Sequence, residues 1–129
     1  MNRNHVKTIA VALGLLALVA VAAAQSTDPK PFLGAWKGTL NIAGTELEIG
    51  LNFTLDEAKT IQGTFDSISQ GGYGIVLGTI EIKDKTISFM LSGVPGDPAF
   101  KGTLDEAGKK LAGDFTQGGA AGTFAVEKQ

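Results

Sequence analysis

The sequence predicts an all-β domain, an eight-stranded antiparallel up-and-down β-barrel built from two similar four-stranded halves. Two observations predict the strands: apolar and polar residues alternate with a period of two, and the connections between alternating segments are short. A third concerns the edges. An open sheet of this length with one apolar face has two edges to protect, and closure into a barrel removes both.

The first 24 residues differ from the rest and are typical of a Sec-type signal peptide. Arg3 and Lys7 give a basic start, an almost wholly apolar run covers 8–23, and small residues end it at Ala24. The alternative is an uncleaved membrane anchor. The apolar run of about 16 residues is shorter than the roughly 20 needed to span hydrocarbon, which favours cleavage after Ala24.

Three segments follow from this interpretation. We expect a signal peptide over 1–24, a linker containing Pro29 and Pro31 over 25–32, and one barrel domain over 33–129. The chain has no cysteine, which rules out a lipoprotein anchor and disulfides. The protein should therefore be exported, without a transmembrane anchor after cleavage, to a periplasm, the cell envelope or the extracellular medium.

The alternation is clearest over 45–55, where Leu47, Ile49 and Leu51 share one face and Glu46 and Glu48 share the other. This is the pattern of a strand with one face in water. The same test predicts seven further strands, at 34–42, 60–67, 75–83, 85–92, 99–105, 110–116 and 121–128. Short turns rich in glycine and aspartate join most of them, which gives a meander of consecutive hairpins.

Composition excludes several kinds of chemistry. Cleavage would leave 105 residues with nine lysines, thirteen acidic residues and no arginine, histidine or cysteine, a net charge of −4. This excludes imidazole acid–base catalysis, zinc ligation by nitrogen or sulfur, and thiolate chemistry. A net negative domain with one basic doublet, Lys109 and Lys110, also disfavours nucleic-acid binding.

The remaining candidate catalytic and metal-binding residues have simpler explanations. A serine nucleophile would need a base, and the chain offers only carboxylates and lysines. Carboxylate pairs such as Glu46 with Glu48 lie on predicted outward faces or turns, where they are best read as surface charge. The acidic residues of two turns, starting at Asp56 and at Asp105, lack calcium-loop spacing. We expect no enzyme activity, no cofactor and no metal.

An internal repeat supports the two-half layout. Thr54–Ala58 recurs unchanged as Thr103–Ala107, 49 residues later. Each copy precedes a strand with a central glycine and then a Gln-Gly-Gly segment, at 70–72 and at 117–119. Two copies are too few for a solenoid or propeller, so the repeat indicates pseudo-symmetry within one barrel.

Glycines fall near the middle of six predicted strands, on faces that we assign to the interior. They are Gly38, Gly63, Gly78, Gly102, Gly113 and Gly122. In one explanation they let a small barrel coil sharply and make room for the aromatic residues Trp36, Phe53, Phe65, Phe89, Phe100, Phe115 and Phe124. In the other they leave an aromatic cavity for a lipid, pigment or other apolar ligand.

The rim that carries both Gln-Gly-Gly segments is the candidate binding site. Strands three and four and strands seven and eight join at the same end of an up-and-down barrel, so Gln70 and Gln117 should share a rim. The candidate residues are Asp66, Ser67, Gln70, Gly71, Tyr73, Gln117 and Gly118, with Ser69 and Thr116 beside them. Tyr73, the chain's one tyrosine, suits an exposed contact. In the simpler alternative, both segments are turns whose glutamines tie the backbone.

The motif Gly34-Ala35-Trp36 resembles the G-x-W start of lipocalins and streptavidin-like barrels. Together with 36–40, 65–75, 100–104 and 113–119, in this order, it is similar to the small lipocalin-like β-domain found N-terminal to some bacterial secreted α/β-hydrolases. The resemblance covers about residues 33 to 128 and implies an accessory module without activity, because the hydrolase domain that carries the chemistry is absent.

The chain also departs from ligand carriers of related shape. Lipocalins commonly pack a late arginine over the tryptophan, and fatty-acid carriers hold carboxylates with arginine, but the predicted mature chain has none. Biotin sites resemble a cage of several tryptophans, whereas Trp36 is alone. The favoured function is therefore an exported interaction module of the cell envelope with a protein partner. The alternative is a carrier of a small apolar ligand, and the size of the interior cavity distinguishes the two.

Overall fold

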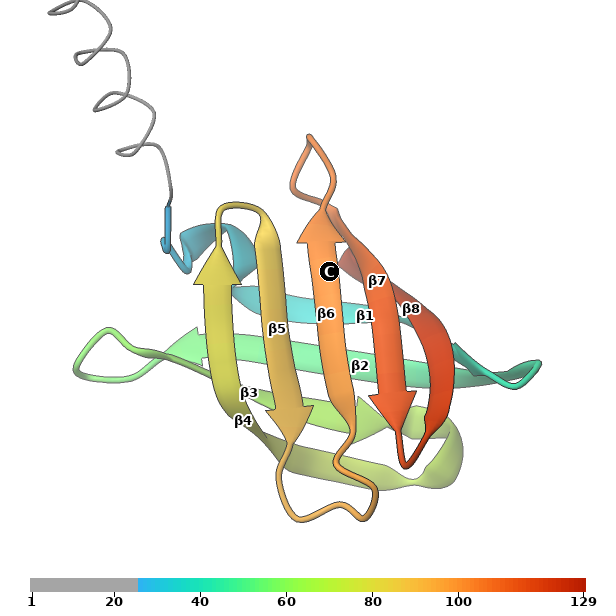
Figure 1. The fold of residues 1–129 in the computed structure, drawn as a ribbon. Helices are drawn as coiled ribbons and strands as arrows, with labels where there is room; N and C mark the ends of the chain where they lie inside the picture. The colour runs from blue at the N-terminus through green and yellow to red at the C-terminus, as the bar shows by residue number, and fades with distance from the viewer. Residues whose placement is uncertain (1–25) are drawn as a thin grey trace, which may run out of the picture.

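The structure, a computed structural model, describes residues 26–129 and confirms the predicted fold class. Its eight strands form one closed barrel in sequential order, each antiparallel to its neighbours (Figure 1). The elements are η1 Lys30–Phe32, β1 Gly34–Ile42, β2 Thr45–Leu55, β3 Ile61–Ser67, η2 Ile68–Gln70, β4 Gly72–Lys83, β5 Thr86–Leu91, β6 Ala99–Leu104, β7 Lys110–Gln117 and β8 Ala120–Lys128. The signal peptide expected over 1–24 lies outside the described residues.

The barrel closes because β1 pairs with both β2 and β8. Trp36 lies opposite Leu51 on one side and opposite Lys128 on the other. Figure 1 shows the central strands β5, β6 and β7 crossing in front of β1 and β2, so the two parts of the sheet face each other across the core. Within residues 26–129 no helix has the length and apolar character to cross a membrane.

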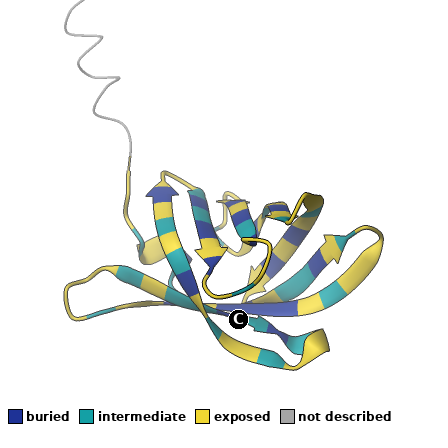
Figure 2. Cartoon of the chain, turned by 60° about the horizontal axis from the view of Figure 1, so that its bottom comes forward, coloured by how far each residue is buried: buried dark blue, intermediate teal, exposed yellow. Residues whose placement is uncertain are grey.

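Burial alternates along the strands as the sequence predicts. In β2, Ile49, Leu51 and Phe53 are buried while Asn52 and Thr54 are exposed. Figure 2 shows this alternation as dark blue and yellow bands along the strands. The inward faces meet in one apolar core, so burial of these side chains is the main source of stability.

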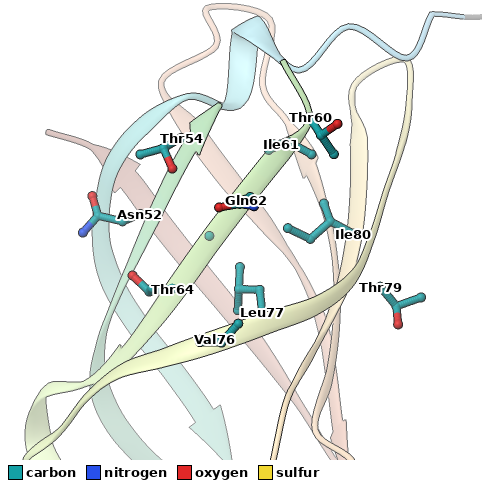
Figure 3. Close-up of a pocket in the computed structure, with 11 residues that line it drawn as sticks. Asn52, Thr54, Thr60, Ile61, Gln62, Thr64, Val76, Leu77, Thr79 and Ile80 are labelled. Atoms are coloured by element: carbon teal, nitrogen blue, oxygen red, sulfur yellow. The ribbon is translucent and has the colours of Figure 1, made fainter. Parts of the chain in front are cut away.

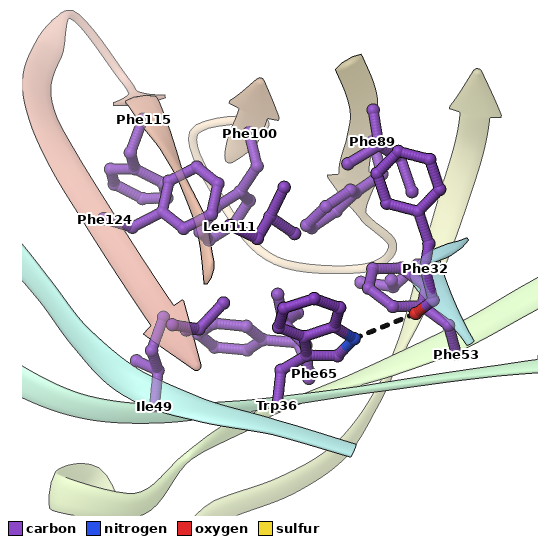
Figure 4. Packing of buried hydrophobic residues seen from close by; sticks show 14 of the residues in the cluster. Phe32, Trp36, Ile49, Phe53, Phe65, Phe89, Phe100, Leu111, Phe115 and Phe124 are labelled. Carbon is purple, nitrogen blue, oxygen red and sulfur yellow. Dashed lines mark hydrogen bonds between the residues drawn. The ribbon is translucent and has the colours of Figure 1, made fainter. Parts of the chain in front are cut away.

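One end of the barrel is plugged by η1. Phe32 has no exposed surface, and its backbone carbonyl oxygen accepts a 2.9 Å hydrogen bond from the indole nitrogen of Trp36 (Figure 4). The residues 30–32, expected to belong to a linker, thus form a short helix whose phenylalanine lies in the core. The periodicity of two did not reveal this contribution, because a single helical turn carries no strand pattern.

The interior is filled by aromatic rings. Phe100 lies at their centre: its ring centroid is 5.0 Å from that of Phe89, in a stacked arrangement, and 4.7 Å from that of Phe115. The rings of Phe65 and Phe124 lie 5.5 and 5.2 Å from it (Figure 4). All seven aromatic residues expected inside are buried, so the middle of the barrel is a packed core.

Close packing explains why glycine occupies the inward positions. A Cβ atom on Gly113 would overlap the carbonyl oxygen of Lys101, and one on Gly38 would overlap that of Ala125. At these positions two strands approach more closely than a side chain permits, which is what a small, strongly coiled barrel needs. A Cβ atom on Gly122 would overlap the carbonyl oxygen of Asn41 in the same way.

Two other glycines make room for side chains. A Cβ on Gly63 would lie 2.7 Å from the Leu77 side chain, and one on Gly102 would lie 2.7 Å from the Phe124 ring. The structural explanation of the glycines therefore accounts for the inward positions, since each missing Cβ is replaced by a neighbouring strand or side chain.

The assignment of Gly78 to the interior is wrong. Leu77 is 7% exposed and points inward, whereas Val76 is 60% exposed, so Gly78 lies on the outer face opposite Met90. The register between β4 and β5 shifts between Gly78 and Glu81, which marks a β-bulge. A bulge adds one residue to a strand and changes which residues face inward. The sequence prediction applied one period of two along the whole strand, and it therefore assigned the residues before the bulge to the wrong face.

The repeated sequences form matching turns between β2 and β3 and between β6 and β7. Asp56 accepts a 2.9 Å hydrogen bond from the Thr60 backbone N–H, and Asp105 accepts one of 2.9 Å from the Lys109 N–H. Each aspartate caps the turn that follows it. The two halves of the barrel therefore share a local structure as well as a sequence.

Candidate functional site

The plugged and the unplugged ends of the barrel differ in what they offer a ligand. At the unplugged rim, four connections meet: the turn at 43–44, η2, the 92–98 loop and the turn at 118–119. A cavity of about 190 Å³ opens between them. It is lined by Leu40, Ile42, Leu47, Phe65, Ser67, Gln70, Ile75, Leu91, Val94, Pro98, Phe115 and Gln117. We call this space the rim pocket.

The structure places Gln70 and Gln117 in the same pocket, as the hairpin topology predicts. Both glutamines are already engaged within the chain. The Ser67 hydroxyl donates a 2.8 Å hydrogen bond to the Gln70 side-chain oxygen, and the Gln117 amide donates one of 3.0 Å to the Pro95 carbonyl oxygen. These bonds hold η2 and the 92–98 loop over the rim. The two glutamines therefore stabilise the loops, as the simpler alternative in the sequence analysis predicts.

The other predicted rim residues lie around the pocket rather than in it. Asp66 accepts a 2.8 Å hydrogen bond from the Gly74 backbone N–H, and the Gly118 N–H bonds to the Gly96 carbonyl oxygen. Gly71 ends η2 in the left-handed conformation, where a residue without Cβ is favoured. Tyr73 is 65% exposed at the start of β4. Asp66, Gly71 and Gly118 thus have structural roles, and the binding role of all four residues stays a prediction.

The rim pocket carries no charged side chain. Its polar groups are one hydroxyl and two amides, on Ser67, Gln70 and Gln117. Ser67 is only 6% exposed and bonds to an amide oxygen, which is too weak a base to activate a nucleophile. Among residues 26–129, no three acidic side chains converge as a metal site would require. The pocket can bind a neutral group by apolar contact and hydrogen bonds.

The sequence did not reveal part of this site or a larger depression in the barrel wall. Val94 and Pro98 line the rim pocket from a loop, where no periodicity shows which side chain turns inward. The second depression, a groove between β3 and β4, has a volume of about 490 Å³. It exists because the two strands separate, and only tertiary pairing reveals this.

Comparison of the chain with protein-family models, with curated proteins and with solved structures finds no match. The resemblance to the domain of secreted hydrolases therefore stays a prediction. The structure shows a closed antiparallel up-and-down β-barrel with one plugged end and a small neutral pocket at the other.

Proposed function

We propose that this protein is an exported, non-catalytic interaction module of the cell envelope, in which the barrel is a rigid support for a binding surface. The packed interior carries the proposal. Pockets for small molecules usually measure about 300–1,000 Å³. Here aromatic rings fill the barrel centre, and the rim pocket at its open end measures about 190 Å³, whereas the larger groove of about 490 Å³ lies between β3 and β4 in the barrel wall.

The chemistry of the rim pocket and the sequence over 1–24 support the same proposal. The nucleophile candidate in the rim pocket, Ser67, bonds to Gln70 and has no acid–base partner there. The basic start and apolar run of the sequence over 1–24 support export, which would bring the domain together with envelope or secreted proteins. A scaffold of this kind would act through its surface, and polypeptides of the envelope are the partners that this proposal names.

Native mass spectrometry of the protein taken gently from its own cell envelope tests the proposal. The expected result is a barrel that carries no small molecule and that is recovered bound to other polypeptides. Removal of residues 1–24 would appear in the same spectrum as a lower chain mass. A stoichiometric extra mass of a few hundred daltons on the barrel would overturn the proposal.

The rim pocket favours a second candidate, a carrier of a small, uncharged ligand. The engineered cavity of about 150 Å³ in another protein binds benzene, so a pocket of this size can hold a short apolar group. Replacing Val94 with phenylalanine would fill the pocket, and replacing the exposed Val76 with phenylalanine is the matched control. A carrier would lose its ligand mass only in the first variant.

A further inference from the structure

Charge is distributed unevenly between the two ends of the barrel. The plugged end consists of the N-terminal segment with η1 and of the turns and strand ends at 55–60, 83–86, 104–110 and 127–129. It holds seven of the nine lysines and seven of the thirteen acidic residues of the described domain, so its charges balance. Two lysines and two acidic residues near the middle of the strands balance as well, namely Lys37, Lys101, Glu81 and Asp114.

The rim end therefore carries the whole net charge of the described domain. Four acidic residues lie there, Glu46, Glu48, Asp66 and Asp97, and none of the lysines within 26–129 accompanies them. Three of the four side chains are exposed, and Asp66 is half-buried. The ion pair found in this part of the chain joins Lys110 to Glu127 at the other end. The rim thus has a charge of −4 that no lysine of the described domain offsets.

These carboxylates surround the mouth of the rim pocket. Each belongs to a residue that is adjacent in the chain to one of the lining residues. The adjacent residues are Glu46 and Glu48 on either side of Leu47, Asp66 before Ser67, and Asp97 before Pro98. Because consecutive Cα atoms are about 3.8 Å apart, the charges lie around the mouth at distances comparable with the Debye length of about 8 Å. Their field therefore reaches a ligand that enters the pocket.

The pocket itself is already formed. The Ser67 hydroxyl bonds to the Gln70 side chain, and the Gly118 N–H donates a 2.8 Å hydrogen bond to the Gly96 carbonyl oxygen, which fixes the 92–98 loop. A site whose loops are fixed before binding loses less conformational entropy on binding. Its volume of about 190 Å³ suits one apolar side chain, since a cavity of about 150 Å³ holds a benzene ring in another protein.

The neutral pocket and the acidic surround together specify the chemistry of a ligand. It needs one apolar group for the pocket and several positive charges around that group. The carboxylates come from β2, β3 and the 92–98 loop, so a single cation cannot meet all of them. An extended polypeptide spaces its side chains about 3.3 Å apart along the chain and can place a cation on either side of an apolar residue. The larger groove in the barrel wall gives no such indication, because none of its lining residues is charged (Figure 3).

We propose that the rim binds a basic segment of a partner polypeptide, with one leucine or phenylalanine side chain in the rim pocket. Lysine or arginine residues on both sides of this anchor would lie against Glu46, Glu48 and Asp97. A buried anchor residue supplies most of the affinity at such a contact, and the surrounding charges supply specificity and salt dependence. The inference rests on the proposed function as an interaction module, and it names the contact surface and the chemistry of the partner.

The test uses protein purified from cells that express residues 1–129. A phage library of random peptides is selected on this protein, and the enriched peptides are synthesised and titrated into 15N-labelled protein by NMR. We expect enriched peptides to be basic, with a leucine or phenylalanine between lysines or arginines. They should shift the side-chain amides of Gln70 and Gln117 and the backbone amide of Val94. Raising the salt from about 0.05 M to about 0.5 M should weaken binding about tenfold.

Reversal of charge at the two ends gives a matched pair of variants. The double variant Glu46→Lys, Glu48→Lys should weaken peptide binding about tenfold, because it places cations at the mouth of the pocket. The double variant Glu57→Lys, Glu106→Lys changes the net charge by the same amount at the plugged end and should leave binding within about twofold. All four glutamates are exposed, so both proteins should fold, and thermal unfolding checks this. An equal loss in both would overturn the proposal.

The anchor is tested separately from the charges. Val94→Phe fills the rim pocket and should abolish peptide binding, whereas Val76→Phe adds the same ring at an exposed site in the barrel wall and should leave it unchanged. If the Val94→Phe protein folds and still binds the peptides, no side chain enters the pocket, and the proposal is wrong.

The remaining outcomes overturn the proposal in distinguishable ways. Enriched peptides that lack basic residues, or that shift amides away from the rim, would overturn the chemistry or the place of the contact. If no peptide is enriched while polypeptides still accompany the barrel in native mass spectra, the rim proposal fails and the proposed function stands. A small molecule on the barrel would overturn both. Oligomers of this chain that Glu46→Lys, Glu48→Lys disrupts would make a second copy the partner in place of another polypeptide.

Discussion

The side-chain ammonium of Lys128 lies 5.4 Å from the centre of the Trp36 ring, and the same nitrogen is 3.4 Å from the carbonyl oxygen of Pro31. The last strand thereby holds both the first strand and η1, which plugs the barrel.

We expect Lys128→Ala to lower the free energy of unfolding by about 0.5 kcal/mol, because an exposed cation over an indole ring contributes about this much. Urea titration followed by the fluorescence of Trp36 measures it. Lys110→Ala is the control, since Lys110 makes one long, exposed ion pair, 3.5 Å from Glu127. An equal loss in both variants would show that the contact with Trp36 adds nothing.

One inward glycine, Gly113, and one outward glycine, Gly50, give predictions of opposite sign. Gly113→Ala should destabilise the protein by about 1–3 kcal/mol, because the new Cβ overlaps the Lys101 carbonyl oxygen. Gly50→Ala should stabilise it by about 0.5 kcal/mol, because its Cβ would meet Trp36 and Asp66 at ordinary distances, 3.5 and 3.6 Å. Thermal unfolding of the two variants compares them directly. A stable Gly113→Ala protein would contradict the observed approach of β6 and β7.

The two matching turns predict a second reciprocal pair. Lys59 has φ 62° in the first turn, and Gly108 has φ 71° at the corresponding place in the second. Because a side chain is unfavourable in this region, Lys59→Gly should stabilise the protein by about 1 kcal/mol and Gly108→Lys should destabilise it by a similar amount. Chemical denaturation of the two single variants measures both. Shifts of the same sign would mean that the turns are not equivalent.

Asp105 predicts a specific loss of stability in acid. The backbone N–H groups of Lys110 and Lys109 hydrogen-bond to its carboxylate and hold its pKa below the ordinary value. A lowered folded-state pKa means that the stabilisation is complete above the unfolded pKa, about 3.9, and is lost as pH falls through the folded value. Carbon-detected NMR titration of the Asp105 carboxyl should show this low pKa.

Asp105→Asn tests the same interaction by stability. The variant should be less stable than the parent protein near neutral pH. The difference should shrink as pH falls below about 4, because the unfolded parent chain takes up a proton on Asp105 there and the folded protein does so only at lower pH. Unfolding midpoints at pH 7 and pH 3 measure it. A difference that stays constant with pH would show that the carboxylate charge is not what supports the turn.

The sequence predicts the strands well because a strand buried on one face alternates apolar and polar residues along the chain. The expected strands at 34–42 and 45–55 coincide with β1 and β2, and the other six differ by up to three residues at their ends. The topology follows because each connection is too short for anything but a hairpin. The shared rim of Gln70 and Gln117 follows in turn from that topology.

The features that the sequence did not predict depend on contacts between distant segments. Phe32 enters the core through a single helical turn that carries no periodic signal. The bulge at Thr79 inverts the faces of the strand around it, and nothing local distinguishes this threonine from those that follow the other glycines. The groove forms because β3 and β4 pair along only part of their length, and no pattern within either strand alone shows where that pairing ends.

The pairing of the first and last strands also determines how the barrel responds to mechanical force. The Gln129 N–H bonds to the Ala35 carbonyl oxygen, and Trp36 lies opposite Lys128, so β1 begins where β8 ends. A pull on residue 26 and residue 129 first strips Ser26 from Asp84 and extracts Phe32, then reaches the seam between β1 and β8 at its end. Its hydrogen bonds would be loaded one after another rather than all together, so we expect a barrel with a tightly packed interior to open under a small tension.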